Sequence, residues 1–137
     1  MKKKLKMVSI LLGTALMITL LSSSTFRQGD RWEAPPEADK LVNPLTKDAK
    51  AWTKGQKIYY KMCWTCHGKQ GKGDGPASVA LIPKPADHTS KIVQDQSDGA
   101  IYWKITNGRS PMPTFGQLLS KTQRWQLTQY IRNLPEK

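Results

Sequence analysis

The stretch Cys63-Trp64-Thr65-Cys66-His67 decides how the rest of the chain is interpreted. Two thiols three positions apart, followed at once by an imidazole, form the C-x-x-C-H pattern of covalent haem attachment. Two thioether bonds must reach the two vinyl groups on one edge of a porphyrin, and the next residue must turn its ring nitrogen under the iron. We therefore predict that Cys63 and Cys66 attach the haem and that His67 is the proximal axial ligand.

Two other kinds of site would use the same cysteines. A structural or redox-active disulfide explains the C-x-x-C spacing but gives no reason for His67. A zinc site needs about four ligands. Only His67 and His88 could join the cysteines, and His67 lies too close to Cys66 for the usual spacing of a zinc finger. Haem attachment is the preferred interpretation, and these two sites are its alternatives.

Residues 1–24 have the composition of an export signal. Four lysines lie within residues 2–6, a 15-residue apolar run extends from Met7 to Leu21, and three serines end at Ser24. This order is typical of a secretory signal peptide, and we predict cleavage near Ser24. The run is shorter than the roughly 18–20 apolar residues of a spanning helix. Because no Ala-x-Ala site is present, an uncleaved membrane anchor is the alternative.

Export agrees with the haem interpretation, because c-type haem is attached outside the cytoplasmic membrane. We expect the mature protein in the periplasm of a bacterium or on the outer face of its cytoplasmic membrane. Loss of residues 1–24 removes four of the 22 basic residues and no acidic one, so the formal charge falls from +12 to +8. This charge predicts an acidic partner protein or an anionic membrane surface, with simple solubility as the alternative. An exported chain without an arginine-rich element is not expected to bind nucleic acid.

Helical patterns predict an all-α domain over residues 49–137. Residues 25–48 contain three prolines and little apolar periodicity, which predicts a linker or extended arm before this domain. The expected helices are residues 49–62, 97–106 and 120–134, with a single helical turn at 77–81. Ser120 and Gln123 form a capping box at the start of the last helix.

The glycine-rich segment Gly68–Pro76 is expected to form turns close to the porphyrin. It does not have the pattern of a phosphate-binding loop, because Lys72 is followed by Gly73 and no strand precedes the segment. Pro83 and Pro85 predict extended chain as far as Asp87.

A six-coordinate haem needs a second axial ligand from the opposite face. Met112 lies 45 residues beyond His67 in a loop stiffened by two prolines, and we predict that its thioether is this ligand. The alternative role of Met112 is an apolar gap-filler. Met62 adjoins Cys63, so it is expected on the proximal side of the haem and not on the opposite face. His88 would give a bis-histidine site of lower potential, but it looks like an exposed loop residue.

The chain resembles the class I, mono-haem bacterial c-type cytochromes over roughly Ala49 to Leu134. The haem motif alone is widespread, whereas the complete ordered set of motifs is specific. The set comprises Gly55-x-x-Ile58-Tyr59, Cys63-x-x-Cys66-His67-Gly68, Gly73-Asp74-Gly75-Pro76-Ala77, Asp98 to Gly108, Met112-Pro113, and Arg124-Trp125-x-x-x-x-Tyr130-Ile131-Arg132-x-Leu134.

The resemblance implies a compact cytochrome c fold, in which three to four helices wrap around one covalently bound haem c. The first and last helices would cross, with Gly55 allowing close contact near Tyr130 or Trp125. The carbonyl of Pro76 would accept the ring N–H of His67 and so orient the proximal ligand.

Outer-sphere electron transfer follows from two strong axial ligands, which leave no open position for a substrate. We expect a periplasmic carrier that shuttles single electrons between respiratory redox partners and is not an enzyme. The alternative is a fixed subunit of a larger membrane-associated oxidoreductase complex. A peroxidase or haem sensor would need a distal acid–base set, which the sequence does not offer. Apolar haem walls are expected at Trp64, Trp103, Ile105, Phe115 and Leu118, and docking lysines at Lys69, Lys72 and Lys104.

Overall fold

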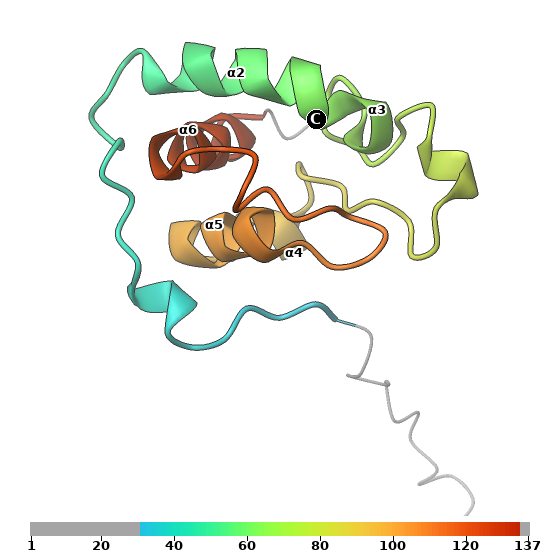
Figure 1. Cartoon of the computed structure of the whole chain (residues 1–137), viewed down its shortest axis with the longest axis horizontal. Coiled ribbons are helices and arrows are strands. Elements are labelled where there is room, and N and C mark those ends of the chain that lie inside the picture. The colour runs from blue at the N-terminus through green and yellow to red at the C-terminus, as the bar shows by residue number, and fades with distance from the viewer. Residues whose placement is uncertain (1–30, 135–137) are drawn as a thin grey trace, which may run out of the picture. The chain divides into compact units, whose positions relative to one another are not determined.

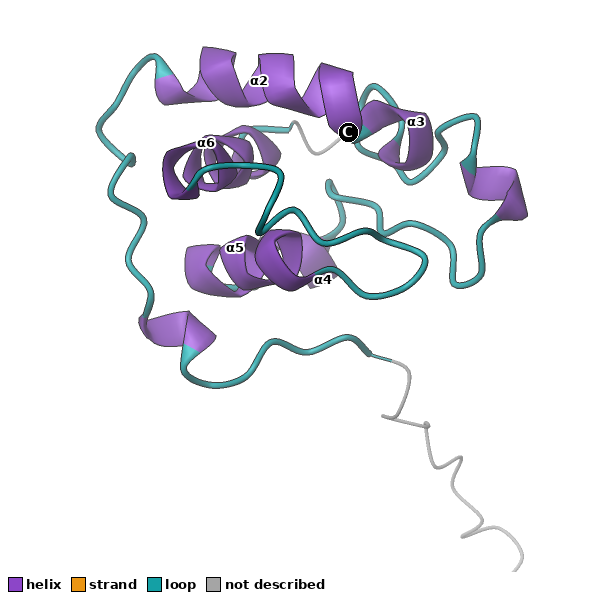
Figure 2. Cartoon of the chain, viewed as in Figure 1, coloured by secondary structure: helices purple, strands orange, loops and turns teal. Residues whose placement is uncertain are grey.

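The computed structural model describes residues 31–134, and the elements named here belong to that part of the chain (Figures 1 and 2). The elements are η2 (Ala38–Lys40), α2 (Ala51–Met62), α3 (Trp64–His67), η3 (Ser78–Ala80), α4 (Lys91–Gln94), α5 (Asp98–Asn107) and α6 (Lys121–Arg132). Within these residues the β structure is one isolated bridge, between Arg109 and Met112. The expected all-α class is confirmed. The predicted signal peptide lies outside the described residues.

Helices α2 and α6 cross in close contact at Gly55. A Cβ atom added at Gly55 would lie 2.0 Å from the carbonyl oxygen of Gln126 and 2.9 Å from the Cβ of Tyr130. Tyr130 also packs its ring against Tyr59 of α2, with centroids 4.9 Å apart. Only glycine allows the two backbones to approach this closely. The contact expected near Tyr130 is confirmed.

The caps of α5 and α6 follow the sequence signals. The Ser97 side chain accepts a hydrogen bond from the Ala100 N–H at the start of α5. Ser120 and Gln123 form the complete capping box of α6. Such caps satisfy backbone N–H groups that have no partner inside the helix. Helix α5 ends before Gly108, whose φ is +63°.

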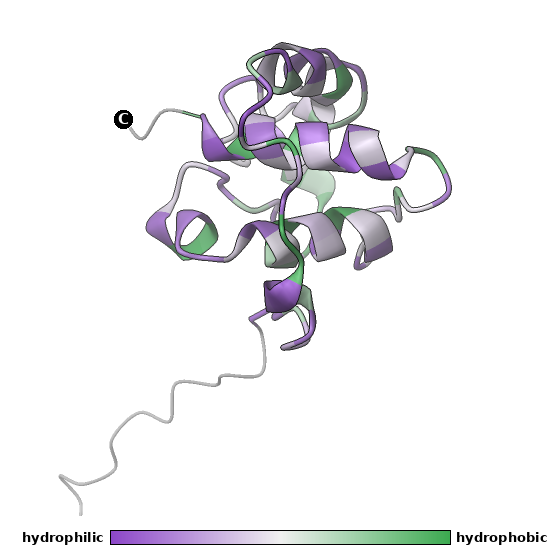
Figure 3. Ribbon diagram, turned by 90° about the vertical axis from the view of Figure 1, so that its left-hand side faces the viewer, coloured by the Kyte–Doolittle hydropathy of each residue, from purple (hydrophilic) through white to green (hydrophobic). Residues whose placement is uncertain are grey.

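A hydrophobic cluster joins α2, α5, α6 and the loop between α5 and α6. Its most buried member is Tyr59 of α2, which has no exposed surface, and Leu127 of α6 is 1% exposed. The other members are Ile101, Ile105, Phe115, Leu119, Tyr130, Ile131 and Leu134. Each helix carries both hydrophobic and hydrophilic residues, as expected of helices that bury one face (Figure 3).

The segment from Glu33 to Asp48 belongs to the folded unit, which begins at Glu33. Ala38 is 2% exposed, and its carbonyl oxygen would lie 1.8 Å from a Cβ atom added at Gly99 of α5. This part of the arm therefore packs against the helices, and the boundary expected at residue 49 stays a prediction. The contacts are made by an irregular segment, so no periodic pattern marked them in the sequence.

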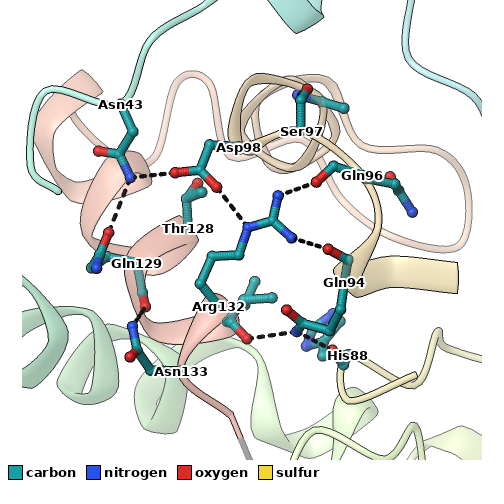
Figure 4. A network of polar contacts seen from close by, with 12 residues as sticks. Asn43, His88, Gln94, Gln96, Ser97, Asp98, Thr128, Gln129, Arg132 and Asn133 are labelled. Carbon is teal, nitrogen blue, oxygen red and sulfur yellow. Dashed lines mark hydrogen bonds and ion pairs between the residues drawn. The ribbon is translucent and has the colours of Figure 1, made fainter. Parts of the chain in front are cut away.

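A polar network anchors this arm to the helices (Figure 4). Asn43 is 4% exposed, and its Nδ2 donates to Asp98 Oδ2 at 2.9 Å and to Gln129 Oε1 at 3.1 Å. Arg132 of α6 pairs with the other oxygen of Asp98 at 2.6 Å and donates to the carbonyls of Gln94 and Gln96. One carboxylate therefore ties the arm, α5 and α6 together. Among residues 31–134, no helix is both long enough and apolar enough to span a membrane.

Candidate haem site

The two cysteines and His67 lie on one tight turn at the end of α2. Helix α2 ends at Met62, and Cys63 caps it with its N–H donating to the Tyr59 carbonyl at 2.8 Å. Helix α3 follows at once, and the His67 N–H donates to the Cys63 carbonyl at 2.9 Å. Both thiols are free and half-buried. The turn presents two thiols and an imidazole together, as covalent haem attachment requires.

The environment of Cys63 does not suit a redox-active disulfide. Its side chain packs against the hydrophobic cluster. Burial raises the pKa of the Cys63 thiol to about 12, and the neighbouring Cys66 adds to the shift. Redox-active C-x-x-C pairs instead have lowered thiol pKa values, because the thiolate is the reactive form. The structure therefore favours the haem interpretation over this alternative.

The ring of His67 is held by a backbone carbonyl. His67 is 9% exposed, and its Nδ1 lies 3.0 Å from the carbonyl oxygen of Ala86. A carbonyl can only accept, so Nδ1 carries the proton and Nε2 keeps its lone pair for a metal. Burial lowers the pKa of His67, and the hydrogen bond to Ala86 opposes this shift only in part. The imidazole is therefore neutral, which is the form that binds iron.

The acceptor of this hydrogen bond is the Ala86 carbonyl, and the role expected of Pro76 stays a prediction. The backbone on both sides of Pro76 is used elsewhere: the Gly75 N–H donates to the Cys66 carbonyl at 3.1 Å and the Ala77 N–H to the Thr65 carbonyl at 2.9 Å. Any residue has a carbonyl group, so the sequence held no signal that pointed to Ala86.

His88 is buried, and the prediction of an exposed loop residue is wrong. It is 9% exposed, and its ring stacks on the His67 ring with centroids 4.1 Å apart and planes 19° from parallel. Burial lowers the pKa of His88 well below its ordinary value, and His67 adds to the shift. Rings stacked face to face cannot bind one iron from opposite sides of a porphyrin, so the geometry opposes the bis-histidine alternative. No periodic pattern in this irregular segment marked His88 as buried.

Met112 lies in the loop between α5 and α6. Arg109 and Met112 exchange two backbone hydrogen bonds of 3.1 and 2.8 Å. The loop is then tied to α5, because the Phe115 N–H donates to the Ile105 carbonyl and the Gly116 N–H to the Thr106 carbonyl. The half-buried side chain of Met112 packs on the same hydrophobic cluster as Cys63 and Trp64. Its role as the second iron ligand stays a prediction.

The expected apolar walls are met in part. Ile105 and Phe115 are each 5% exposed and belong to the hydrophobic cluster, and Trp64 packs against it. Trp103 is half-buried. Leu118 is 62% exposed, whereas its neighbour Leu119 is 7% exposed and enters the cluster. The residue of this loop that enters the cluster is therefore Leu119, one position after the predicted Leu118.

The residues present fit a covalently bound haem. Two free thiols and a neutral imidazole share one turn, and the imidazole Nε2 is left for iron. A thioether on a separate loop packs on the same apolar cluster. In c-type haem proteins, cysteine thiols form the covalent bonds to the porphyrin, and an imidazole and a thioether can bind the iron.

Comparison with known proteins gives the same identification. The family model described as "Cytochrome C oxidase, cbb3-type, subunit III" matches residues 50–131. A solved chain of the Kuenenia stuttgartiensis reducing HAO-like protein complex Kustc0457/Kustc0458 is similar, with a TM-score of 0.61 and 34% identity. The similarity covers 69% of this chain and 49% of that chain, so this chain spans about half the length of that relative. No curated protein matches the sequence. The chain belongs to the family of the cbb3-type subunit III model and is a c-type cytochrome that binds haem c covalently.

Proposed function

We propose that this protein carries single electrons between respiratory redox partners through one haem whose iron is bound by His67 and Met112. The observation that carries the proposal is the fixed, neutral His67 ring, with Nδ1 donating to Ala86 and Nε2 left for iron. Haem iron held in this way alternates between its ferrous and ferric states. With Met112 as the second ligand, no coordination position remains for a substrate.

The chain's own residues favour the ferrous form. A thioether ligand raises the reduction potential relative to a second imidazole. Apolar side chains such as Ile105 and Phe115 disfavour the additional charge of the ferric state, because they exclude water from the site. Both influences suit a carrier of relatively high potential.

Two exposed lysines beside the haem motif are proposed to meet an acidic redox partner. The Nζ of Lys69 lies 5.6 Å from the centre of the ring of Trp64, which is located between the two cysteines in the sequence. Lys72 is exposed in the same loop as Lys69. Lys104 is a weaker candidate than the sequence suggested, because it is half-buried and donates to Gln96. Small, short-lived interfaces of this kind are typical of electron-transfer encounters.

The alternative is a fixed subunit of a larger membrane-associated oxidoreductase complex. It is favoured by the similar solved chain, which comes from a complex that its title calls a reducing HAO-like protein complex. Isolation from the native membrane and soluble fractions in mild detergent separates the two functions. A stable partner in fixed stoichiometry supports the subunit, and a monomer in the periplasmic fraction supports the carrier. An intact leader in the membrane fraction would support a tethered form.

The ligand set is tested by spectroscopy of full-length protein made in a host that matures c-type cytochromes. We expect the pyridine haemochrome of a haem bound by two thioethers, and a weak ferric charge-transfer band from methionine ligation that disappears in Met112→Ala. Rapid carbon monoxide binding by the reduced wild type would contradict two tight axial ligands and favour an enzyme or a sensor. A colourless protein with free thiols would refute the proposal.

A further inference from the structure

We propose that His88 is a positioning residue for the proximal ligand: its ring lies flat on His67 and fixes how that imidazole is turned about its bond to iron. The inference rests on the proposed ligation of iron by His67. It assigns to His88 a role that neither a structural histidine nor an axial ligand would have.

A single hydrogen bond does not fix the orientation of an imidazole. The side chain turns about two torsion angles, and the second of these is broad for ring side chains. The bond from His67 Nδ1 to Ala86 directs one ring atom, but it leaves the ring able to tilt about that direction. A parallel ring 4.1 Å away, at only 19° between planes, blocks this tilt from one face.

Contacts on both its backbone and its ring hold His88 in place, so its ring can limit the tilt of the His67 ring. Its N–H donates to the Gly71 carbonyl at 2.6 Å, and its carbonyl accepts from Gln94 Nε2 at 2.6 Å. The same Gln94 amide also donates to the Ile131 carbonyl at 3.0 Å, which ties it to α6 (Figure 4). The ring of Tyr59 also lies beside the His88 ring, with centroids 5.9 Å apart and planes at 67°. The His88 ring is thus placed between Tyr59 and His67 by contacts on its backbone and on its faces.

The Nδ1 atom of His88 is the second observation. This atom is buried and has no hydrogen-bond partner among the described residues. A buried polar atom without a partner is costly and calls for an explanation. A leucine would fill the space without that cost, but it has no flat face to offer to His67. The stacked contact with His67, and not the polar atom, therefore carries the inference.

The test compares ferric holoprotein of the wild type, His88→Phe and His88→Leu. The separation of the outer g values in electron paramagnetic resonance, and the spread of the haem methyl shifts in proton NMR, both report the plane of the axial imidazole. We expect His88→Phe to keep the wild-type pattern because it keeps a flat ring. We expect His88→Leu to change both readouts by several times the difference between wild type and His88→Phe.

Thr128→Ala is the matched control. Thr128 is also fully buried, but its hydroxyl donates within α6 to the Arg124 carbonyl. It reports what a loss of stability alone does to the spectra, and we expect no change in either readout. If His88→Leu does not retain haem, His88→Met provides a second variant without a flat ring.

Three results would overturn the inference: wild-type spectra in His88→Leu or His88→Met, equal changes in His88→Phe and His88→Leu, or an equal change in Thr128→Ala. Failure of the proposed function looks different, because the wild type itself would then lack the low-spin spectrum of a histidine-bound haem.

Discussion

The proximal segment and the distal loop of this cytochrome are held by different kinds of contact. On the proximal side, the carbonyls of Thr65, Cys66 and His67 accept hydrogen bonds from the backbone of residues 77, 75 and 73 in turn. Residues 73–77 are thus held against the haem motif by a series of backbone hydrogen bonds. The distal loop that carries Met112 has two backbone bonds to α5 and one reciprocal pair of its own.

This difference indicates which of the two proposed ligands the fold protects. The His67 ring is buried and is fixed by Ala86 and His88, whereas Met112 is half-buried between two exposed prolines. A region with fewer backbone contacts and more exposed side chains opens at lower free energy. We therefore expect the iron to lose its distal ligand well before its proximal one when the protein is stressed.

The most direct way to break this comparison is a pair of glycine substitutions. A Cβ atom added at Gly75 would lie 2.4 Å from the Thr65 carbonyl oxygen and 2.5 Å from that of Trp64, whereas at Gly116 the nearest atom, the Thr106 carbonyl oxygen, lies at 3.0 Å. Backbone atoms cannot move aside cheaply, so we expect Gly75→Ala to lower the free energy of unfolding by about 3 kcal/mol. We expect Gly116→Ala to cost about 1 kcal/mol or less. Chemical denaturation of the two holoproteins measures both values, and equal losses would contradict the asymmetry.

Removal of the distal sulfur should leave the fold in place. Met112→Ala loses a half-buried side chain and the proposed ligand, and we expect a loss of about 2 kcal/mol with covalent haem retained. The reduction potential should fall, and the reduced protein should bind carbon monoxide rapidly. Met62→Ala is the matched control, because Met62 is also half-buried against the same cluster. Loss of methionine ligation in Met62→Ala rather than in Met112→Ala would reverse the ligand assignment.

A substitution in the arm, outside the proximal segment and the distal loop, provides a reference for the effect of lost stability alone. Asn43→Ala removes two hydrogen bonds that tie the arm to Asp98 and Gln129, and leaves buried polar groups short of partners. We expect a loss of about 1–2 kcal/mol in denaturation, with the visible spectrum and the potential unchanged. A change in the spectrum would show that the arm acts on the haem and is not only an anchor.

The smallest expected effect is at Tyr59, on the proximal side. Its hydroxyl donates to the Gly68 carbonyl at 2.9 Å, and Tyr59→Phe should cost about 1 kcal/mol at neutral pH. Burial raises the pKa of Tyr59, so the unfolded chain releases this proton first as the pH rises through about 10. Stability gained from the neutral hydroxyl is therefore present below that pH and is lost above it. Stability curves from pH 8 to pH 11 should converge for wild type and Tyr59→Phe, and parallel curves would contradict the assignment.

Local signals in the sequence predicted much of the fold. The Ser120 capping box, Gly55 at the helix crossing and the apolar stripe ending at Leu134 act within one helix or one close contact. The haem motif is equally local, since all its atoms lie on one turn. These features depend on residues whose type alone carries the physical reason.

Contacts of irregular segments were not predictable in the same way. The Ala86 carbonyl belongs to the backbone, so its side chain gives no sign of its role. The burial of His88 and the docking of Asn43 depend on where extended chain returns to the helices, which has no period to detect. The short helix α4 (Lys91–Gln94) was missed because four residues carry too little pattern.

The backbone hydrogen bonds next to the haem motif also constrain the order in which haem attachment and folding occur. Both thiols are half-buried, and the carbonyls of Thr65, Cys66 and His67 accept hydrogen bonds from the N–H groups of residues 77, 75 and 73. An attachment enzyme needs both sulfur atoms accessible at once. We therefore expect the enzyme to act on a nascent or unfolded polypeptide. The segment of residues 73–77 then folds against the haem motif only after the haem has been attached.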